Sequence, residues 1–303
     1  MKNVFWSGIL VFGFVLGQAA FAQEVALTFD DLPAHGPVPQ GLTRVGIIRA
    51  ILKDLKDANA PGVYGFINAG KLEQVPADME VLKLWRAAGY PLGNHTYTHP
   101  SLNKISAKDF EQNIEQNQAL LKSLMDGQDW HWLRYPFLDE GDTVEKRRAV
   151  RAYLREHNYR IAQVTLDFQD WAWNSPYARC LAKNDTNAIE QLKTMYANTA
   201  EEFLDLGAKL ANLVYGRDIK HVLLLHVGAF ETVMLPRLLE ILKRCGYKLI
   251  TLPEAESDSA YESDPDIVLP EGGTLLEQMI VSKHLAMPVH APVPISELES
   301  MCQ

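Results

Sequence analysis

Acidic and histidine side chains follow the first and third of several short apolar runs in this sequence. Asp30 and Asp31 are adjacent after the first run, and His95 and His99 lie four apart after the third. Two imidazoles and one carboxylate make the three-ligand set of a catalytic zinc, with one position open for water. The other carboxylate could then act on that water, because neighbouring side chains of an extended chain point different ways. Pro100 disfavours a helix at His99, so we expect the histidine pair on a loop at a strand end.

Each of these patterns also has a structural interpretation. Adjacent acids after a strand often cap a helix or form a turn. A histidine at the end of an apolar run, such as His226, is often a hydrogen-bonded core residue. If His226 instead lies beside the acids, it is the natural proton donor to a leaving group. Asp167 or Asp170 could then fix its tautomer and raise its pKa.

Arg134 and two tryptophans follow other apolar runs. Arg134 could form a buried structural ion pair, or it could hold a catalytic carboxylate ionised and oriented. Trp171 and Trp173 could pack in the core, or they could stack on the face of a sugar beside the site.

The elements that must position these residues alternate between strand and helix. Short apolar or β-branched runs are typical of buried parallel strands, and amphipathic helical patterns lie between most of them. Repeated βα units predict an α/β fold, and about seven units favour a distorted (β/α)7-type barrel. In such barrels the catalytic groups lie at the carboxyl ends of the strands, where all the candidates above fall. The predicted strands are 25–29, 63–67, 90–94, 132–134, 160–165, 221–226 and 247–252, and the predicted helices are 43–58, 77–88, 106–125, 143–158 and 232–245.

Two segments depart from this alternation. Residues 178–220 contain a long helical pattern, 188–215, and are expected to form a helical insertion. Residues 256–303 have few periodic signals, and we expect a C-terminal extension that wraps the domain. This tail should hold one short helix near 274–284 and an extended stretch at 290–295. The catalytic domain with its insertion is then expected to cover residues 23–255.

The composition is that of an ordinary soluble protein. The chain has 303 residues, 47% of them hydrophobic and 22% charged, and a net charge of −9. This acidic balance, without a Lys/Arg stripe, argues against nucleic-acid binding. Residues 1–22 have the three parts of a signal peptide, which are a basic residue (Lys2), a short apolar core and a cleavage site at Ala20-Phe21-Ala22. The sequence therefore predicts a signal peptide here. We therefore expect a monomer without a stable membrane anchor, periplasmic or secreted after cleavage near Ala22.

The sequence has three cysteines. An exported protein meets an oxidising compartment, where one disulfide and one free thiol are expected. Cys245 falls late in a predicted helix and is expected to be buried. Cys302 lies in a tail that needs tying down. We therefore expect a disulfide between Cys180 and Cys302.

Five segments, in this order, resemble the polysaccharide deacetylase family with the NodB-homology fold (carbohydrate esterase family 4). Any one motif is weak, but the ordered set is specific and covers residues 24 to about 253. The segments are Thr28-Phe29-Asp30-Asp31, His95-Thr96-Tyr97-Thr98-His99, Arg134-Tyr135-Pro136-Phe137, Asp167-Phe168-Gln169-Asp170-Trp171 and Leu224-Leu225-His226.

The resemblance implies a glycoside hydrolase/deacetylase barrel and a metal-dependent N-deacetylase. It implies that Asp30 is the base, held by Arg134, and that His226 is the general acid, oriented by Asp170. Val227-Gly228 follow His226 where many members carry a polar residue. The implied metal ligands are Asp31, His95 and His99, and the implied substrate-binding residues are Tyr135, Phe137 through its backbone N–H, Asp167 and Trp171.

The expected activity is hydrolysis of N-acetyl groups on glycans of the peptidoglycan, chitin or poly-N-acetylglucosamine type. The expected cofactor is one divalent metal, zinc first, although Co²⁺, Mn²⁺, Fe²⁺ and Ni²⁺ fit the same donors. Two alternatives stay open. One is hydrolysis of a small amide at the same metal site, and the other is a glycan-binding protein without turnover.

Overall fold

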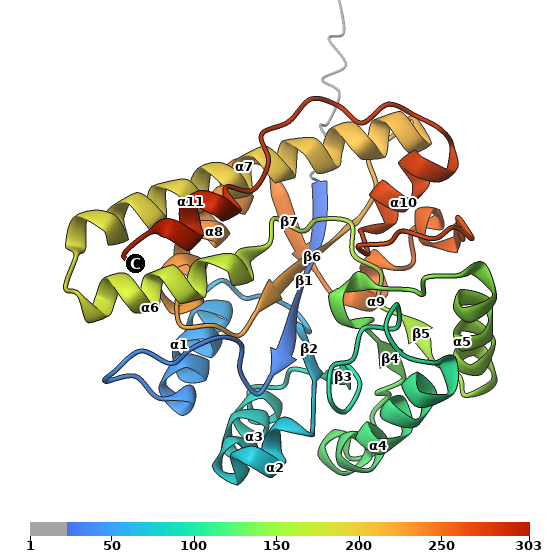
Figure 1. Cartoon of the computed structure of the whole chain (residues 1–303), viewed down its shortest axis with the longest axis horizontal. Coiled ribbons are helices and arrows are strands. Elements are labelled where there is room, and N and C mark those ends of the chain that lie inside the picture. Colours follow the sequence, from blue (N-terminus) through green and yellow to red (C-terminus); the bar gives the residue numbers. More distant parts are fainter. Residues whose placement is uncertain (1–22) are drawn as a thin grey trace, which may run out of the picture.

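A computed structural model describes residues 23–303, and the predicted signal peptide lies outside the described residues. Seven parallel strands in this part of the chain form one sheet that curls into a distorted barrel surrounded by helices (Figure 1). The predicted α/β barrel is therefore confirmed. The strands are β1 (Gln23–Leu32), β2 (Tyr64–Ile67), β3 (Leu92–Asn94), β4 (Trp132–Leu133), β5 (Arg160–Ile161), β6 (His221–His226) and β7 (Tyr247–Ile250).

The long strand β1 organises the sheet. One of its edges pairs with β6 along Val25–Asp30, and its other edge pairs first with β7 and then with β2. Strands β2, β3, β4 and β5 follow in that order. Beyond β5, Leu166 forms an isolated parallel bridge with Leu223 of β6, which brings the chain back to β6. The carboxyl ends of β1, β3, β4 and β6 therefore lie around one rim.

Helices cover the outside of the sheet because their apolar stripes face it. Helix α1 buries Ile48, Ile51 and Leu55 completely, and the side chain of Thr43 caps its amino end by accepting from the Gly46 N–H. The helices are α1 (Arg44–Asp57), α2 (Lys71–Gln74), α3 (Met79–Ala87), α4 (Ala107–Met125), α5 (Val144–Glu156), α6 (Asn174–Ala182), α7 (Thr186–Tyr215), α8 (Glu231–Arg244), α9 (Leu252–Ala255), α10 (Leu275–Ser282) and α11 (Ile295–Ser300).

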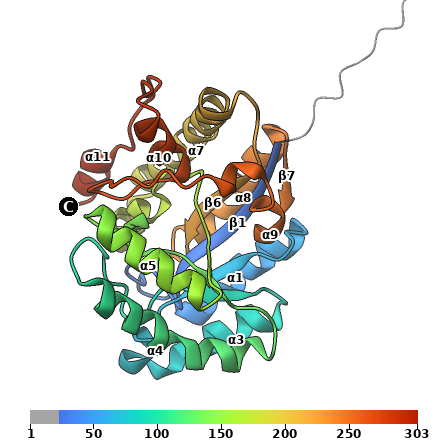
Figure 2. The ribbon, with the colours of Figure 1, turned by 90° about the vertical axis from the view of Figure 1, so that its right-hand side faces the viewer.

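Two helices lie in the region of the predicted insertion, and the first, α6, begins at Asn174, before the predicted start at residue 178. Helix α7 has 30 residues and lies across one side of the barrel, and α6 lies before it (Figure 1). The tail passes over this region: α10 shares an apolar cluster with α7, and α10 and α11 lie on the same side of the molecule as α7 (Figure 2). The predicted helix near 274–284 matches α10.

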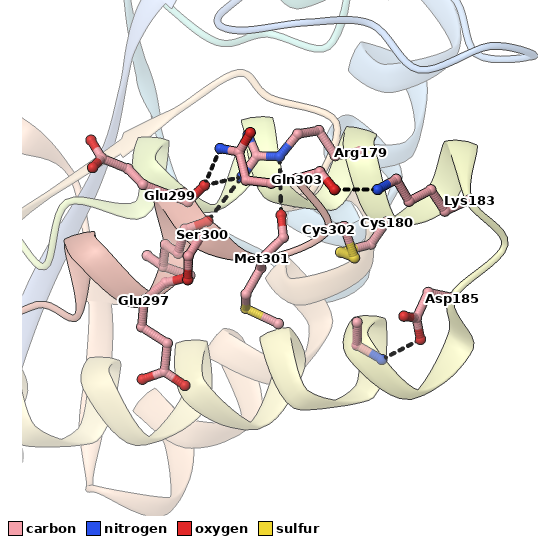
Figure 3. The surroundings of a disulfide bond; sticks show 12 residues. Arg179, Cys180, Lys183, Asp185, Glu297, Glu299, Ser300, Met301, Cys302 and Gln303 are labelled. Carbon is pink, nitrogen blue, oxygen red and sulfur yellow. Dashed lines mark hydrogen bonds between the residues drawn. A yellow bond between two sulfur atoms is a disulfide. The ribbon is translucent and has the colours of Figure 1, made fainter.

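A disulfide attaches the tail to α6. Cys180 and Cys302 are bonded with their Cα atoms 5.1 Å apart, across 122 residues of sequence (Figure 3). Arg179, next to Cys180, donates to the Met301 carbonyl at 3.0 Å and to the Leu298 carbonyl at 2.9 Å. The end of the chain is thus held covalently and by hydrogen bonds.

Four details of the prediction are wrong, and the first is strand β5, which ends at Ile161 rather than at residue 165. The tail has a second helix, α11, which begins at Ile295 inside the stretch expected to be extended. Strand β7 ends at Ile250, because Thr251 caps α9 through a capping box with Glu254. Cys245 is exposed, since it lies at the carboxyl end of α8 rather than on its buried face.

No helix among residues 23–303 is long and apolar enough to cross a membrane.

Candidate active site

A distortion of β1 separates the two acidic side chains. The β1–β2 register shifts between Phe29 and Leu32, and Asp31 has a φ of 67°, in the left-handed region. Bulges of this kind re-aim side chains beside active sites. As a result Asp30 points toward Arg134, whereas Asp31 points toward His99 and its neighbours.

Asp31, His95 and His99 form a compact group of metal-binding atoms. One ligand atom from each lies within 4.8 Å of the others. His95 Nδ1 lies 2.8 Å from the Arg134 carbonyl oxygen, which can only accept, so Nδ1 carries the proton and Nε2 is free to bind. Metal-binding histidines usually donate their other N–H in this way. Lys71 Nζ donates to Asp31 Oδ1 at 3.0 Å.

The charge states of this group suit a metal. Burial lowers the pKa of His95 well below its usual range and that of His99 to about 4, which leaves neutral imidazoles. Burial alone would raise the pKa of Asp31. The hydrogen bond from His35 and the positive charge of Lys71 hold it well below its usual range instead. An ionised carboxylate and two neutral imidazoles fit Zn²⁺ and similar cations.

Asp30 is buried beside Arg134. Arg134 Nη1 lies 3.2 and 3.3 Å from the two carboxylate oxygens, while its Nε donates to the Ala162 carbonyl at 2.7 Å and its Nη2 to Thr28 Oγ1 at 3.1 Å. Burial raises the pKa of Asp30 to about 6, although the Arg134 charge acts in the opposite direction. Asp30 is therefore a carboxylate with raised basicity in a fixed orientation.

His226 is held by Asp170. One Asp170 oxygen lies 2.7 Å from His226 Nδ1, and the other accepts the His226 backbone N–H at 2.8 Å. Burial of His226 favours its neutral ring and by itself would lower its pKa. The charge and hydrogen bond of Asp170, together with the charges of Asp31 and Asp30, outweigh the effect of burial and raise the pKa of His226 to about 9. Of the two acids considered from the sequence, Asp170 is the one that fixes the tautomer.

These groups share one cavity of about 460 Å³. Trp171 is 42% exposed at its wall, whereas Trp173 is fully buried in the core. Asp167 also lines the cavity, and burial raises its pKa to about 6. The lining residues are Asp30, Asp31, His35, His95, His99, Tyr135, Phe137, Leu138, Asp167, Gln169, Trp171, Leu224, His226 and Glu271.

The Tyr135–Leu138 turn forms part of the cavity rim. Phe137 has a φ of 59° and is 59% exposed. The backbone N–H groups of Leu138 and Asp139 bond back to Tyr135 and Pro136 within the turn. By contrast, the Tyr135 ring stacks on Phe110 in the core and the residue is 2% exposed, so little of it reaches the cavity.

Sequence reasoning missed three residues at this site: His35, Lys71 and Glu271. His35 Nδ1 lies 2.7 Å from Asp31 Oδ2, and its ring centroid lies 4.8 Å from that of His226. His35 lies only four residues after Asp31, but no local sequence pattern predicts that the chain turns back and pairs the two side chains. Lys71 and Glu271 had no local sequence signal either, because the folding of α2 brings Lys71 to Asp31 and the folding of the tail brings Glu271 to the cavity.

Fold and site together define a parallel-barrel protein with a two-histidine, one-carboxylate centre at the carboxyl ends of its strands. Residues 18–162 match the family model described as polysaccharide deacetylase. This match to the polysaccharide deacetylase model, over a little less than half of the chain, is the resemblance that the five motifs indicate.

Proteins similar to this chain carry related names. A chitin deacetylase of Arthroderma benhamiae is 27% identical over 169 residues, which are 56% of this chain and 41% of that protein. A peptidoglycan-N-acetylglucosamine deacetylase of Bacillus cereus is 30% identical over 148 residues, 49% of this chain and 46% of that protein. The chain thus spans less than half the length of these two relatives. In fold it is similar to the chitin deacetylase structure from Colletotrichum lindemuthianum, with a TM-score of 0.55, 24% identity, and coverage of 78% of this chain and 88% of that one.

Proposed function

We propose that this protein is a metal-dependent hydrolase that removes N-acetyl groups from glycans. One observation carries the proposal: Asp30, Asp31, His95, His99 and His226 converge on a single cavity. A carboxylate with a raised pKa and an imidazole with a raised pKa face the same space as a metal-ligand set. Groups whose environments push their pKa values apart are typical of acid–base pairs in active sites.

In this proposal Asp31, His95 and His99 hold one divalent cation, zinc first. When bound, such a cation supplies Lewis acidity to water and to the amide carbonyl. Asp30, kept in place by Arg134, accepts a proton from the water that attacks the acetamide carbon. The raised pKa of Asp30, about 6, makes it a better base than an exposed aspartate and leaves it ionised at neutral pH.

His226 serves the second half of the reaction. Its pKa of about 9 keeps the ring protonated at neutral pH, so it can donate to the departing nitrogen as the C–N bond breaks. The Phe137 N–H at the rim is proposed as a donor to the developing oxyanion, a contribution usually worth roughly 3–4 kcal/mol. The products are acetate and an amino sugar.

Several features support a glycan as the substrate. Trp171 presents a partly exposed indole at the cavity wall, and Asp167 adds a hydrogen-bonding carboxylate. Aromatic faces beside polar groups suit sugar rings. The named activities of the relatives, on chitin and on peptidoglycan N-acetylglucosamine, point to the same substrate class. Export after cleavage near Ala22 remains part of the proposal, and amino-terminal sequencing of the mature protein tests it.

Acetate release tests the proposed activity. The protein would be stripped with a chelator and assayed on N-acetylglucosamine oligomers and on peptidoglycan, before and after addition of zinc or cobalt. We expect release only with metal, and none from Asp30→Asn, which should still bind metal. His95→Ala should lose metal binding. If a protein that binds metal releases acetate from no glycan, the proposal is wrong and a small-amide substrate or glycan binding alone becomes the better account.

A further inference from the structure

We propose that Asp31, His35 and His226 form a second cation site, and that a transition-metal cation bound there inhibits the enzyme. The inhibitory part rests on the proposed function, whereas the binding part does not. One ligand atom from each of the three residues lies within 4.8 Å of the others, as also holds for Asp31, His95 and His99. The two groups share only Asp31.

The two oxygens of Asp31 face different histidines. Oδ1 lies 3.5 Å from His99 Nε2, and Oδ2 lies 2.7 Å from His35 Nδ1. The His35 and His226 ring centroids are 4.8 Å apart, nearly the same as the 4.7 Å between His95 and His99. In two-metal sites the cations lie about 3.5–4 Å apart, a separation that one carboxylate can span with its two oxygens.

His226 also has the outer partner that metal-binding histidines usually have. Its Nδ1 bonds Asp170 at 2.7 Å, so Nε2 is the atom that a cation would bind, in exchange for the proton that this nitrogen carries at neutral pH. A carboxylate behind the ring fixes its orientation and strengthens it as a donor to a metal. The Arg134 carbonyl does the same for His95 in the first group.

The surrounding charge favours a cation. Asp30, Asp167 and Glu271 line the same cavity. The nearby ammonium of Lys71 bonds Asp31 Oδ1 and the Asp31 carbonyl, and not the Oδ2 atom that faces His35. The second group can therefore gain a divalent cation without displacing the contact between Lys71 and Asp31.

Occupation of this site should stop turnover. A cation on His226 Nε2 takes the atom that the proposed reaction uses to protonate the leaving nitrogen. Excess metal should therefore inhibit, while the first equivalent activates. The second site should therefore be detected in two ways, as a second bound metal ion and as loss of activity at excess metal.

Zinc stoichiometry tests the binding directly, without substrate. Chelator-treated full-length protein would be titrated with zinc by calorimetry, and bound zinc counted after equilibrium dialysis. We expect wild-type protein to bind two zinc ions per chain. At the same zinc concentrations His35→Gln should bind one, because its affinity for the second ion is reduced at least ~10-fold. Asp170→Asn, which removes no ligand, should weaken the second ion by roughly 10–100-fold. His131→Gln, an imidazole paired with Asp129 and absent from both groups, is the matched control and should keep two.

Activity supplies the second readout. Acetate release from a chitin-type oligomer should fall at excess zinc in the wild type and in His131→Gln, and the zinc concentration for half-inhibition should rise at least ~10-fold in His35→Gln. A wild type that binds one zinc at all concentrations up to about 1 mM, or a His35→Gln variant that still binds two, overturns the inference. Two bound zinc ions in a protein that deacetylates nothing would sink the proposed function and leave the second site standing.

Discussion

Asp30 and His226 are buried groups whose pKa values are both raised, for opposite reasons. Burial raises that of Asp30 to about 6, and the Asp170 carboxylate raises that of His226 to about 9 against the effect of burial. The proposed reaction needs Asp30 without its proton and His226 with one. The two requirements are met together only between these two values.

The first prediction is a bell-shaped dependence of kcat/KM on pH. Activity should rise as Asp30 loses its proton near pH 6 and fall as His226 loses its own near pH 9. The measurement is acetate release from an N-acetylglucosamine oligomer between pH 4 and 11 at fixed metal concentration. Activity that keeps rising above pH 10 would contradict the assignment of His226 as the acid.

The second prediction concerns the residue behind His226. Asp170→Asn removes the negative charge that raises the His226 pKa, so the alkaline limb should move to lower pH and kcat should fall at least ~100-fold. Asp167→Asn is the matched control: Asp167 lines the same cavity but makes no hydrogen bond to His226. Equal shifts in both variants would show that the general field of the cavity, and not the Asp170 contact, sets the pKa.

At the scale of elements, the tail and the Phe137 turn are packed against each other. A Cβ atom added to Gly272 would lie 2.2 Å from the Phe137 carbonyl oxygen, and Gly272 has a φ of 69°. On either side of it, the Pro270 carbonyl accepts from Asn103 Nδ2 at 3.0 Å, and the Leu275 N–H donates to the Val164 carbonyl at 2.7 Å. The tail is thus part of the wall that fixes the proposed oxyanion donor.

The third prediction follows from that contact. Gly272→Ala should push the turn out of place and lower kcat/KM by at least ~10-fold, with a loss of about 1–3 kcal/mol in the free energy of unfolding. Gly246→Ala is the control, because Gly246 has a similar φ of 84° and nothing within 4 Å of an added Cβ. Acetate release and denaturant unfolding of both variants measure the difference. Matched losses of activity would mean that the turn does not depend on the tail.

The strands and the main site residues could be predicted from sequence because both are local signals. Buried parallel strands appear as short apolar runs, and residues just past them must meet at one rim. Helix α11 could not be predicted, since six residues hold less than two turns of pattern and a proline-rich stretch precedes them. The inward packing of Tyr135 was also hidden, because it depends on stacking against Phe110, which lies on a separate element, α4.

Glu271 and the pairing of His35 with Asp31 could not be predicted for a different reason. Glu271 reaches the cavity only because the tail packs on the Phe137 turn. His35 reaches Asp31 because the chain bends back after the bulge in β1. The position of Glu271 depends on a contact between distant segments, whereas that of His35 depends on a local irregularity of β1 that no sequence pattern marks.

At the scale of the molecule, the disulfide closes a large part of the chain on itself. It spans 122 residues, including α7, α8, β6 and most of the tail. A cross-link over so long a loop restricts the unfolded chain strongly.

The fourth prediction is that Cys302→Ser lowers the free energy of unfolding by about 2–4 kcal/mol, measured by guanidinium unfolding under oxidising conditions. Cys245→Ser, at the exposed cysteine, is the control and should change it by less than about 0.5 kcal/mol. If the two variants unfold alike, the tail is held by its noncovalent contacts with α6 alone.

The ring of strands divides the proposed chemistry between two parts of the chain. The groups that act on the attacking water come from β1 and the loop after β3, whereas the proton for the leaving group comes from β6. A phenolate departs without help, so an aryl acetate ester needs the first part only. His226→Ala should therefore keep much of its esterase rate on such an ester while losing amide hydrolysis, and the rates on a series of aryl acetates should become more sensitive to the acidity of the phenol. The same barrel would then act as an esterase with half of its catalytic groups.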